Sequence, residues 1–184
     1  ATRGRIRRTE RYAAGPFVKL GRQARAPFVG SASPDVWNSA VAVATMAASH
    51  CLAGIPRNGV LSDITRQADL ASEAFEWLSI MVKEIFSGRR ERKKVLAWWR
   101  GNILGTLEAS PEKGLLRAKA LFAAGVRAFR VYSPEPGTGV VETVAVLRKK
   151  YGEEIEIFAG QIISVEQAKE AEAAGADGLF VGIG

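Results

Sequence analysis

Several polar residues and glycines stand directly after apolar runs, where loop side chains can do chemistry. Gly182 and Gly184 flank Ile183, and closely spaced glycine amides can approach an anion, although the same pattern also makes a tight turn. Gln161 follows Ala-Gly at the end of an apolar run. Its amide could hydrogen-bond a substrate hydroxyl or only cap the loop. We take these positions as candidate substrate-binding residues.

A stiff loop, Ser133-Pro-Glu-Pro-Gly, follows another apolar run. Its Glu135 could act as an acid or base, whereas most loop glutamates are simply solvated. Ser31 and Ser33 follow the first apolar run of the chain and provide hydroxyls there. All of these residues follow candidate strands, and in a parallel α/β fold such positions meet at one edge of the sheet.

The adjacent His50 and Cys51 resemble a Cys/His pair, but neighbouring residues face different directions and no third member is evident. A buried, unreactive thiol is the better interpretation of Cys51. One histidine and one cysteine cannot build a closed zinc site. We therefore expect no metal site, and the single cysteine fits a reducing compartment.

The elements that must position these residues are clearest after residue 126. Short apolar runs alternate there with helical stretches of ten to fourteen residues. The runs are apolar throughout, which is typical of parallel strands covered on both faces. The pattern predicts strands within 126–134, 154–162 and 176–184, joined by helices at 137–152 and 164–175.

Upstream of residue 126 the same alternation continues less regularly. Apolar runs predict strands over 27–33, 52–56 and 95–99, and the spacing predicts helices over 36–50, 62–86 and 110–125. Ser62 is the expected cap of the second helix, whose apolar stripe contains Leu70, Ala74, Trp77, Leu78, Met81 and Ile85. In the third strand Trp98 and Trp99 would face opposite sides. The residues expected after the second and third strands are Arg57, Asn58, Arg100 and Asn102.

The element order favours an α/β fold of the (β/α)8 TIM-barrel type, with about six βα units in this chain. A closed barrel needs eight units, so we expect residues 1–184 to form part of a larger folding unit or to be completed by a second polypeptide. An open, doubly wound sheet of six strands is the alternative. We place the partial barrel at 26–184 and a separate arm at 1–25.

The arm carries the net charge. The formal charge of the chain is +7, and residues 1–25 hold eight basic groups against Glu10 alone. The remainder is therefore neutral, with 18 basic and 18 acidic residues. Such an arm could bind nucleic acid, lie against a partner subunit or be solvated. With little aromatic interleaving we consider nucleic-acid binding the weaker option. No secretory or membrane-spanning segment is evident.

Residues 27–184 resemble the catalytic barrel of the IMP dehydrogenase/GMP reductase family. AAGVRAFRV resembles the family's "aGvD" turn and strand, and IFAGQIISVEQAKEAEAAGADGLFVGIG resembles its "iaGNvvt…aGad…vGiG" passage. FVGSASPDV resembles the family's Ser-x-Met-Asp-x-Val strand end. This sequence differs from the family's motifs at four positions. Ser133 stands nearest the place of a ribose-binding Asp, and Gln161 replaces Asn. Phe180 replaces a basic residue, and Ser33 or Pro34 replaces Met.

The resemblance implies NAD- or NADP-dependent hydride transfer on a purine ribonucleotide, through a cysteine expected beyond Gly184. No catalytic residue is then expected within this chain. Ser31, Ser33, Gln161, Gly182 and Gly184 would bind the nucleotide. Ser133 and Glu135 would contact the cofactor.

The family's regulatory CBS module would fall near residues 87–94 and is absent here, as in GMP reductases. The resemblance further suggests a cytoplasmic homotetramer. Two alternatives stay open. One is a divergent, non-catalytic barrel subunit with a binding or assembly role, and the other is a different phosphate-binding TIM-barrel enzyme.

Overall fold

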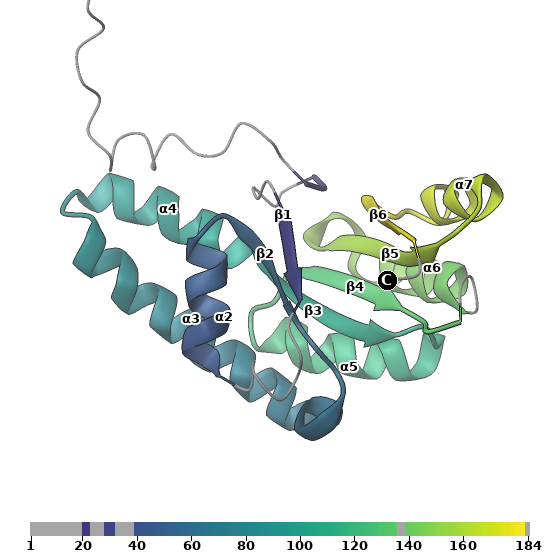
Figure 1. Cartoon of the computed structure of the whole chain (residues 1–184), viewed down its shortest axis with the longest axis horizontal. Coiled ribbons are helices and arrows are strands. Elements are labelled where there is room, and N and C mark those ends of the chain that lie inside the picture. The colour runs from purple at the N-terminus through teal and green to yellow at the C-terminus, as the bar shows by residue number, and fades with distance from the viewer. Residues whose placement is uncertain (1–19, 23–27, 32–38, 136–138, 183–184) are drawn as a thin grey trace, which may run out of the picture.

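Six parallel strands form the centre of the computed structural model, which describes residues 20–22, 28–31, 39–135 and 139–182 (Figure 1). The strands pair in sequence order from first to last, and each pair is parallel. Their bounds are β1 Phe28–Ser31, β2 Cys51–Ile55, β3 Ile103–Glu108, β4 Ala128–Tyr132, β5 Glu156–Ile162 and β6 Gly178–Val181.

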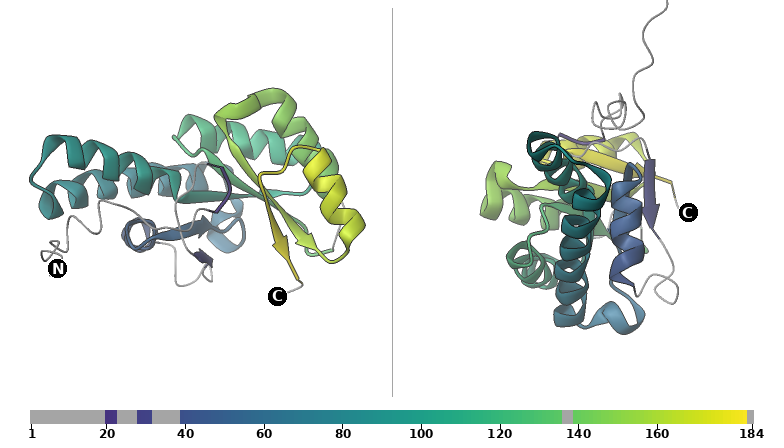
Figure 2. Two further views of the ribbon diagram at one scale, coloured as in Figure 1. Left: turned by 90° about the horizontal axis from the view of Figure 1, so that it is seen from above. Right: turned by 90° about the vertical axis from the view of Figure 1, so that its left-hand side faces the viewer.

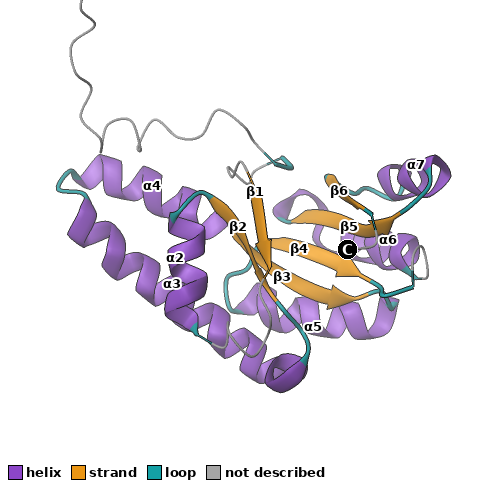
Figure 3. Cartoon of the chain, viewed as in Figure 1, coloured by secondary structure: helices purple, strands orange, loops and turns teal. Residues whose placement is uncertain are grey.

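Helices connect the strands and lie on the outside of the curled sheet (Figure 3). Ser39 caps the first of them through its hydroxyl, and Ser164 caps the last in the same way. Pro111 occupies the first turn of α5, where its missing N–H is no loss. The bounds are α2 Ala40–Ala48, α3 Ile64–Ile85, α4 Arg89–Gly101, α5 Pro111–Ala123, α6 Val140–Tyr151 and α7 Val165–Ala173, with short 3-10 turns at Gly59–Ser62 and Gly152–Glu154.

The two faces of the sheet bury different clusters. On the outer face, strand residues such as Ile55, Leu107 and Phe129 pack with the helices in the main core. On the inner face a smaller cluster comes from strands alone: Leu52, Leu104, Ala128 and Phe158, with Phe180 packed against it. β2 and β5 are buried along their whole length, as expected for strands covered on both sides.

The sheet curls around the strand-only cluster (Figure 2). Neighbouring strands in sequence are neighbours throughout, whereas a doubly wound sheet reverses its strand order at a switch point. The structure is therefore a half-barrel of six parallel strands, consistent with part of a TIM barrel, and the predicted fold class is confirmed.

The predicted third strand at 95–99 is wrong. These residues lie in α4, and β3 begins later, at Ile103. Val95, Trp98 and Trp99 are all buried on one side of that helix, so the two tryptophans do not alternate across a strand. Spacing of three and four residues is helical. Two helices, α3 and α4, thus connect β2 to β3.

Details of α3 also differ from the prediction. Asp63, rather than Ser62, caps the helix, and its carboxylate accepts from the backbone N–H groups of Thr65 and Arg66. The apolar stripe is correct at positions such as Leu70, Ala74 and Leu78, which are buried. Trp77 and Ile85, however, are 40% and 53% exposed. The buried stripe instead runs through Ala71, Phe75 and Val82.

The amino ends of β5 and β6 are held by a cluster of charges. Arg148 on α6 pairs with Asp177, which also accepts from the backbone N–H of Ile157 at 2.8 Å. Arg22, in the segment before β1, pairs with the same carboxylate at 3.2 Å and donates to the carbonyl of Ile155. Residues 20–22 are thereby fixed against this end of the sheet. Across the residues described, no helix has the length and apolar character needed to cross a membrane.

Candidate functional site

The carboxyl ends of the strands meet at one edge of the half-barrel, which we call the mouth. Ser133 follows β4, Gln161 lies near the end of β5, and Gly182 follows β6. Ser31 ends β1, in register with Gly54 of β2. Ser33 and Gly184 lie outside the described residues. The structure thus brings the describable candidates to one edge, where parallel barrels carry their sites.

Hydrogen bonds between β4 and β5 hold Ser133 and Gln161 in place. The Gln161 amide nitrogen donates to the hydroxyl of Tyr132 at 3.3 Å. The backbone N–H of Ser133 donates to the carbonyl of Gly160, while its hydroxyl accepts from the N–H of Glu135 at 3.1 Å. Both Ser133 and Gln161 are buried, whereas Glu135 is exposed. The pair therefore has a fixed position, and the glutamate extends into solvent.

Gly182 has a positive φ of 111°, and open space surrounds the position where a side chain would begin. A ligand can approach its backbone closely there. Its own N–H, however, donates to the carbonyl of Ile162 at 2.9 Å. An anion beside Gly182 would therefore need donors other than this amide.

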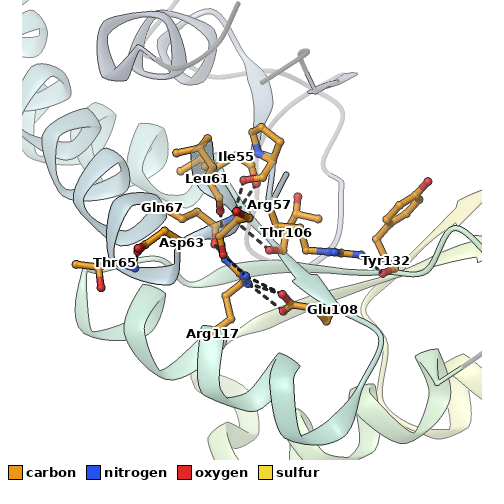
Figure 4. A network of polar contacts seen from close by, with 12 residues as sticks. Ile55, Arg57, Leu61, Asp63, Thr65, Gln67, Thr106, Glu108, Arg117 and Tyr132 are labelled. Atoms are coloured by element: carbon orange, nitrogen blue, oxygen red, sulfur yellow. Dashed lines mark hydrogen bonds and ion pairs between the residues drawn. The ribbon is translucent and has the colours of Figure 1, made fainter. Parts of the chain in front are cut away.

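A buried polar network that the sequence analysis did not predict lies beside the mouth, between β3 and the helices (Figure 4). Arg117 on α5 forms a two-pronged ion pair with Glu108 at the end of β3, with contacts of 2.7–2.9 Å. It also donates to Gln67 of α3 and to the carbonyls of Leu61 and Ser62. One side chain thus ties together α5, β3, α3 and the turn before α3.

Gln67 extends this network to the strand ends. Its amide nitrogen donates to the carbonyls of Ile55, Pro56 and Thr106 at 2.9–3.3 Å. Burial alone would raise the pKa of Glu108, but hydrogen bonds and charge from Arg117, with charge from Arg57, bring that pKa below its ordinary value. Glu108 is therefore held as a carboxylate and is a structural group rather than a free base.

Two further arginines lie around the ring of Tyr132. Arg57, after β2, donates to the carbonyl of Tyr132 at 3.2 Å, and its guanidinium carbon is 6.0 Å from the ring centroid. Arg130, in the middle of β4, lies between two rings, 4.6 Å from the centroid of Tyr132 and 4.3 Å from that of Phe180. The sequence reasoning missed Arg130, although a charge within the apolar run AFRVY was a visible signal.

Other sequence candidates lie away from the mouth. Arg100 and Asn102 do not follow the third strand but precede it. Asn102 is buried and donates to the carbonyl of Ala47, at the opposite end of the sheet. His50 and Cys51 lie at the amino end of β2. Cys51 is buried, as expected, and burial raises the pKa of its thiol. No cluster of three or more metal-ligating side chains occurs within the described part of the chain.

Comparison with protein families places this chain in a known domain family. Residues 22–184 match the sequence model of the IMP dehydrogenase / GMP reductase domain. A comparison with curated protein sequences gave no match. The family match spans all six strands and every described residue of the mouth. The chain therefore belongs to the IMP dehydrogenase/GMP reductase family.

Proposed function

We propose that this chain carries part of the site of an oxidoreductase that transfers a hydride between a purine ribonucleotide and NAD or NADP. The observation that carries the proposal is the family match through residues 22–184, combined with the position of Ser133, Gln161 and Gly182 at one edge of the half-barrel. The residues of the mouth, rather than the barrel, support this function, because a barrel alone is compatible with many chemistries.

On the nucleotide side, Gln161 is the best-supported contact. Its nitrogen is fixed by Tyr132, which leaves the amide oxygen to accept from a ribose hydroxyl. Gly182 offers a close backbone approach beside it. We assign the same role to Ser31 and, outside the described residues, to Ser33 and Gly184. These groups bind and orient the substrate, and the nucleophilic cysteine that the family implies is expected beyond Gly184.

On the cofactor side, Ser133 and Glu135 have the chemistry that a ribose requires. The exposed carboxylate of Glu135 can accept from two vicinal hydroxyls, and the Ser133 hydroxyl keeps its proton for donation while accepting from the backbone. The residues therefore fit a dinucleotide. When bound, a nicotinamide dinucleotide supplies the hydride acceptor or donor. Ser133 and Glu135 would fix its position against the purine.

A binding or assembly role is the second candidate, and one observation favours it. Glu108, the carboxylate at the end of β3, is bound by Arg117 and carries a lowered pKa. A carboxylate held in this way is a poor proton acceptor at neutral pH. A different phosphate-binding barrel enzyme is the third option. The tetramer, the cytoplasmic location and the boundary of the arm at residue 25 stay predictions.

The test is an activity assay on the full-length natural protein, followed by nicotinamide absorbance. IMP with NAD and GMP with NADPH are the two pairs to try. We expect turnover with one pair, and a higher KM for the nucleotide in Gln161→Leu, which removes the amide but keeps the volume. Nucleotide binding without turnover would favour the binding role. If the protein binds neither nucleotide, both the oxidoreductase proposal and the nucleotide-binding role are refuted.

A further inference from the structure

Arg130 is half-buried, and it differs from the other buried or half-buried arginines of the strands and helices in what surrounds its charge. Arg117 is paired with Glu108, Arg148 with Asp177, and Arg127 donates to two backbone carbonyls at 2.8 Å. Arg130 has no hydrogen-bond acceptor and no carboxylate partner among the described residues, and its Nε is buried without a partner. Its described contacts are the rings of Tyr132 and Phe180.

Partial burial of the Arg130 guanidinium without an acceptor for its Nε–H is unfavourable unless a further group binds it. Burial lowers the pKa of the Arg130 guanidinium, yet arginine keeps its proton in proteins. Stacking on two rings offsets only part of the lost hydration, because a cation–π contact supplies no hydrogen-bond acceptor. A buried charge normally has an oppositely charged or strongly accepting partner. On the inner face of β4, the half-buried Arg130 therefore has a buried Nε–H without an acceptor and no ion pair with a described residue.

Arg57 adds a second positive group beside the same ring. Its Nε is also buried without a partner, although one of its terminal nitrogens donates to the Tyr132 carbonyl. The Glu108 carboxylate, whose pKa Arg57 helps to lower, is already bound by Arg117. Two guanidinium groups, those of Arg117 and Arg57, thus act on one carboxylate, and Arg130 adds a third positive charge beside Tyr132. The exposed Glu135 forms no ion pair with a described residue, so the excess is not neutralised there.

The Tyr132 hydroxyl supplies a neutral donor at the same place. It accepts from the Gln161 amide at 3.3 Å, which leaves its own proton free to donate. The inner side of the mouth therefore combines two planar, multiply donating cations with one hydroxyl donor. Guanidinium groups match the oxygens of phosphate in this geometry, and two of them complement a dianion better than a single charge.

We propose that Arg130 and Arg57 bind the phosphate group of a small-molecule ligand on the inner face of the half-barrel, beside Tyr132. The site is built by β4 and the loop after β2, and not by the glycines after β6. It requires neither hydride transfer nor a purine. The inference therefore stands independently of the proposed oxidoreductase activity.

The test is a titration of the full-length protein with inorganic phosphate at constant ionic strength, with chloride as the balancing anion. The arginine Nε–H signals are followed by NMR. We expect the Arg130 signal to shift saturably with phosphate. Arg130→Gln should weaken phosphate binding about tenfold or more, because a charged hydrogen bond is worth roughly 1.5–3 kcal/mol, and Arg57→Gln should weaken it less.

The matched control is Arg127→Gln. Arg127 also stacks on a ring, 3.7 Å from the centroid of Phe122, but its charge already has two carbonyl acceptors. This variant should bind phosphate as the natural protein does. If Arg130→Gln does not fold, the natural protein still decides, because an Arg130 signal that does not respond to phosphate overturns the proposal.

Two other outcomes would also overturn it. Equal phosphate affinity in Arg130→Gln and in the natural protein would show that the anion binds elsewhere. Tighter binding of succinate than of phosphate would show that the unmatched charge is meant for a carboxylate. A saturable response to phosphate that is lost in Arg130→Gln and kept in Arg127→Gln supports the site as proposed.

Discussion

Replacement of Arg117 by methionine should be among the most destabilising single changes in this half-barrel. The Arg117 side chain is only 5% exposed and pairs with Glu108, which is 20% exposed, at 2.7 Å. Methionine keeps much of the length and apolar stem of arginine but none of its donors. The substitution therefore leaves Glu108 and three other oxygens, of Leu61, Ser62 and Gln67, without a donor they now have.

The expected loss of stability follows from the burial of the pair. Removal of one partner from a buried ion pair costs about 3–5 kcal/mol, because the remaining charge is left uncompensated. The additional oxygens increase the cost, but not additively, since they belong to the same network. Glu108 is partly exposed, so water recovers some of the loss. We therefore expect Arg117→Met to lower the free energy of unfolding by about 3–4 kcal/mol.

The assay is urea denaturation at neutral pH, with Arg66→Met as the matched control. Arg66 is an exposed arginine on α3 whose side chain contacts no described partner, so its substitution should change stability by less than about 0.5 kcal/mol. A double-mutant cycle with Glu108→Gln then isolates the pair. A cost below about 1 kcal/mol for Arg117→Met, or no coupling with Glu108, would refute the reasoning.

The same pair predicts how stability depends on acid. The pKa of Glu108 is lowered in the folded protein from its ordinary value of 4.5, so the unfolded chain binds the proton more readily. The stabilisation is therefore complete above pH 4.5 and is lost as pH falls through the folded pKa. In Arg117→Met this part of the acid dependence should shrink. An unchanged acid profile in that variant would contradict the assignment.

Three further predictions concern single positions. Gly114→Ala should lower the free energy of unfolding by about 1–3 kcal/mol, because the new methyl would lie 2.7 Å from the Glu108 carbonyl. Gly101→Ala is the control: nothing lies within 4 Å of its new methyl, so it should leave stability in thermal unfolding unchanged or raise it. Burial lowers the pKa of His50 from 6.5, so the free energy of unfolding should fall as pH drops below that value. His50→Asn should make stability less dependent on pH in this range, and an unaltered pH dependence would contradict the assignment to His50. Cys51 should react with a thiol reagent only in denaturant, and fast native labelling would show that it is not buried.

The sequence was sufficient for the C-terminal half of the fold, because burial there leaves an unambiguous signal. β5 is buried along its whole length and is followed by α7, which the Ser164 hydroxyl caps. The same reasoning failed at 95–99, where Val, Leu, Ala and two tryptophans form a short apolar run. Such a run fits a buried strand or one side of a helix. The preceding charged residues 89–94 are good helix formers, and they extend α4 through the tryptophans.

The site was predictable only at the level of strand ends. Counting βα units places Ser133, Gln161 and Gly182 at one edge, which the structure bears out. It cannot reveal that Gln161 is fixed by Tyr132, or that Arg117 reaches Gln67, 50 residues away. Those contacts depend on side-chain direction and on the distance between helices. Neither quantity is encoded in local spacing.

Arg130 is a charged residue within the apolar run AFRVY, and this local signal could have identified it as a candidate site residue. In β4 the residues that face the helices are buried, whereas Arg130 and Tyr132 are half-buried. An arginine in the middle of AFRVY loses part of its hydration there, which favours a partner in the fold. The stable solutions are a carboxylate, a set of carbonyls or a ligand. The described structure places neither of the first two beside it and provides two aromatic rings instead. The buried Nε of Arg130, which has no acceptor among the described residues, is the observation on which the proposed ligand on the inner face rests. The phosphate titration tests that proposal directly.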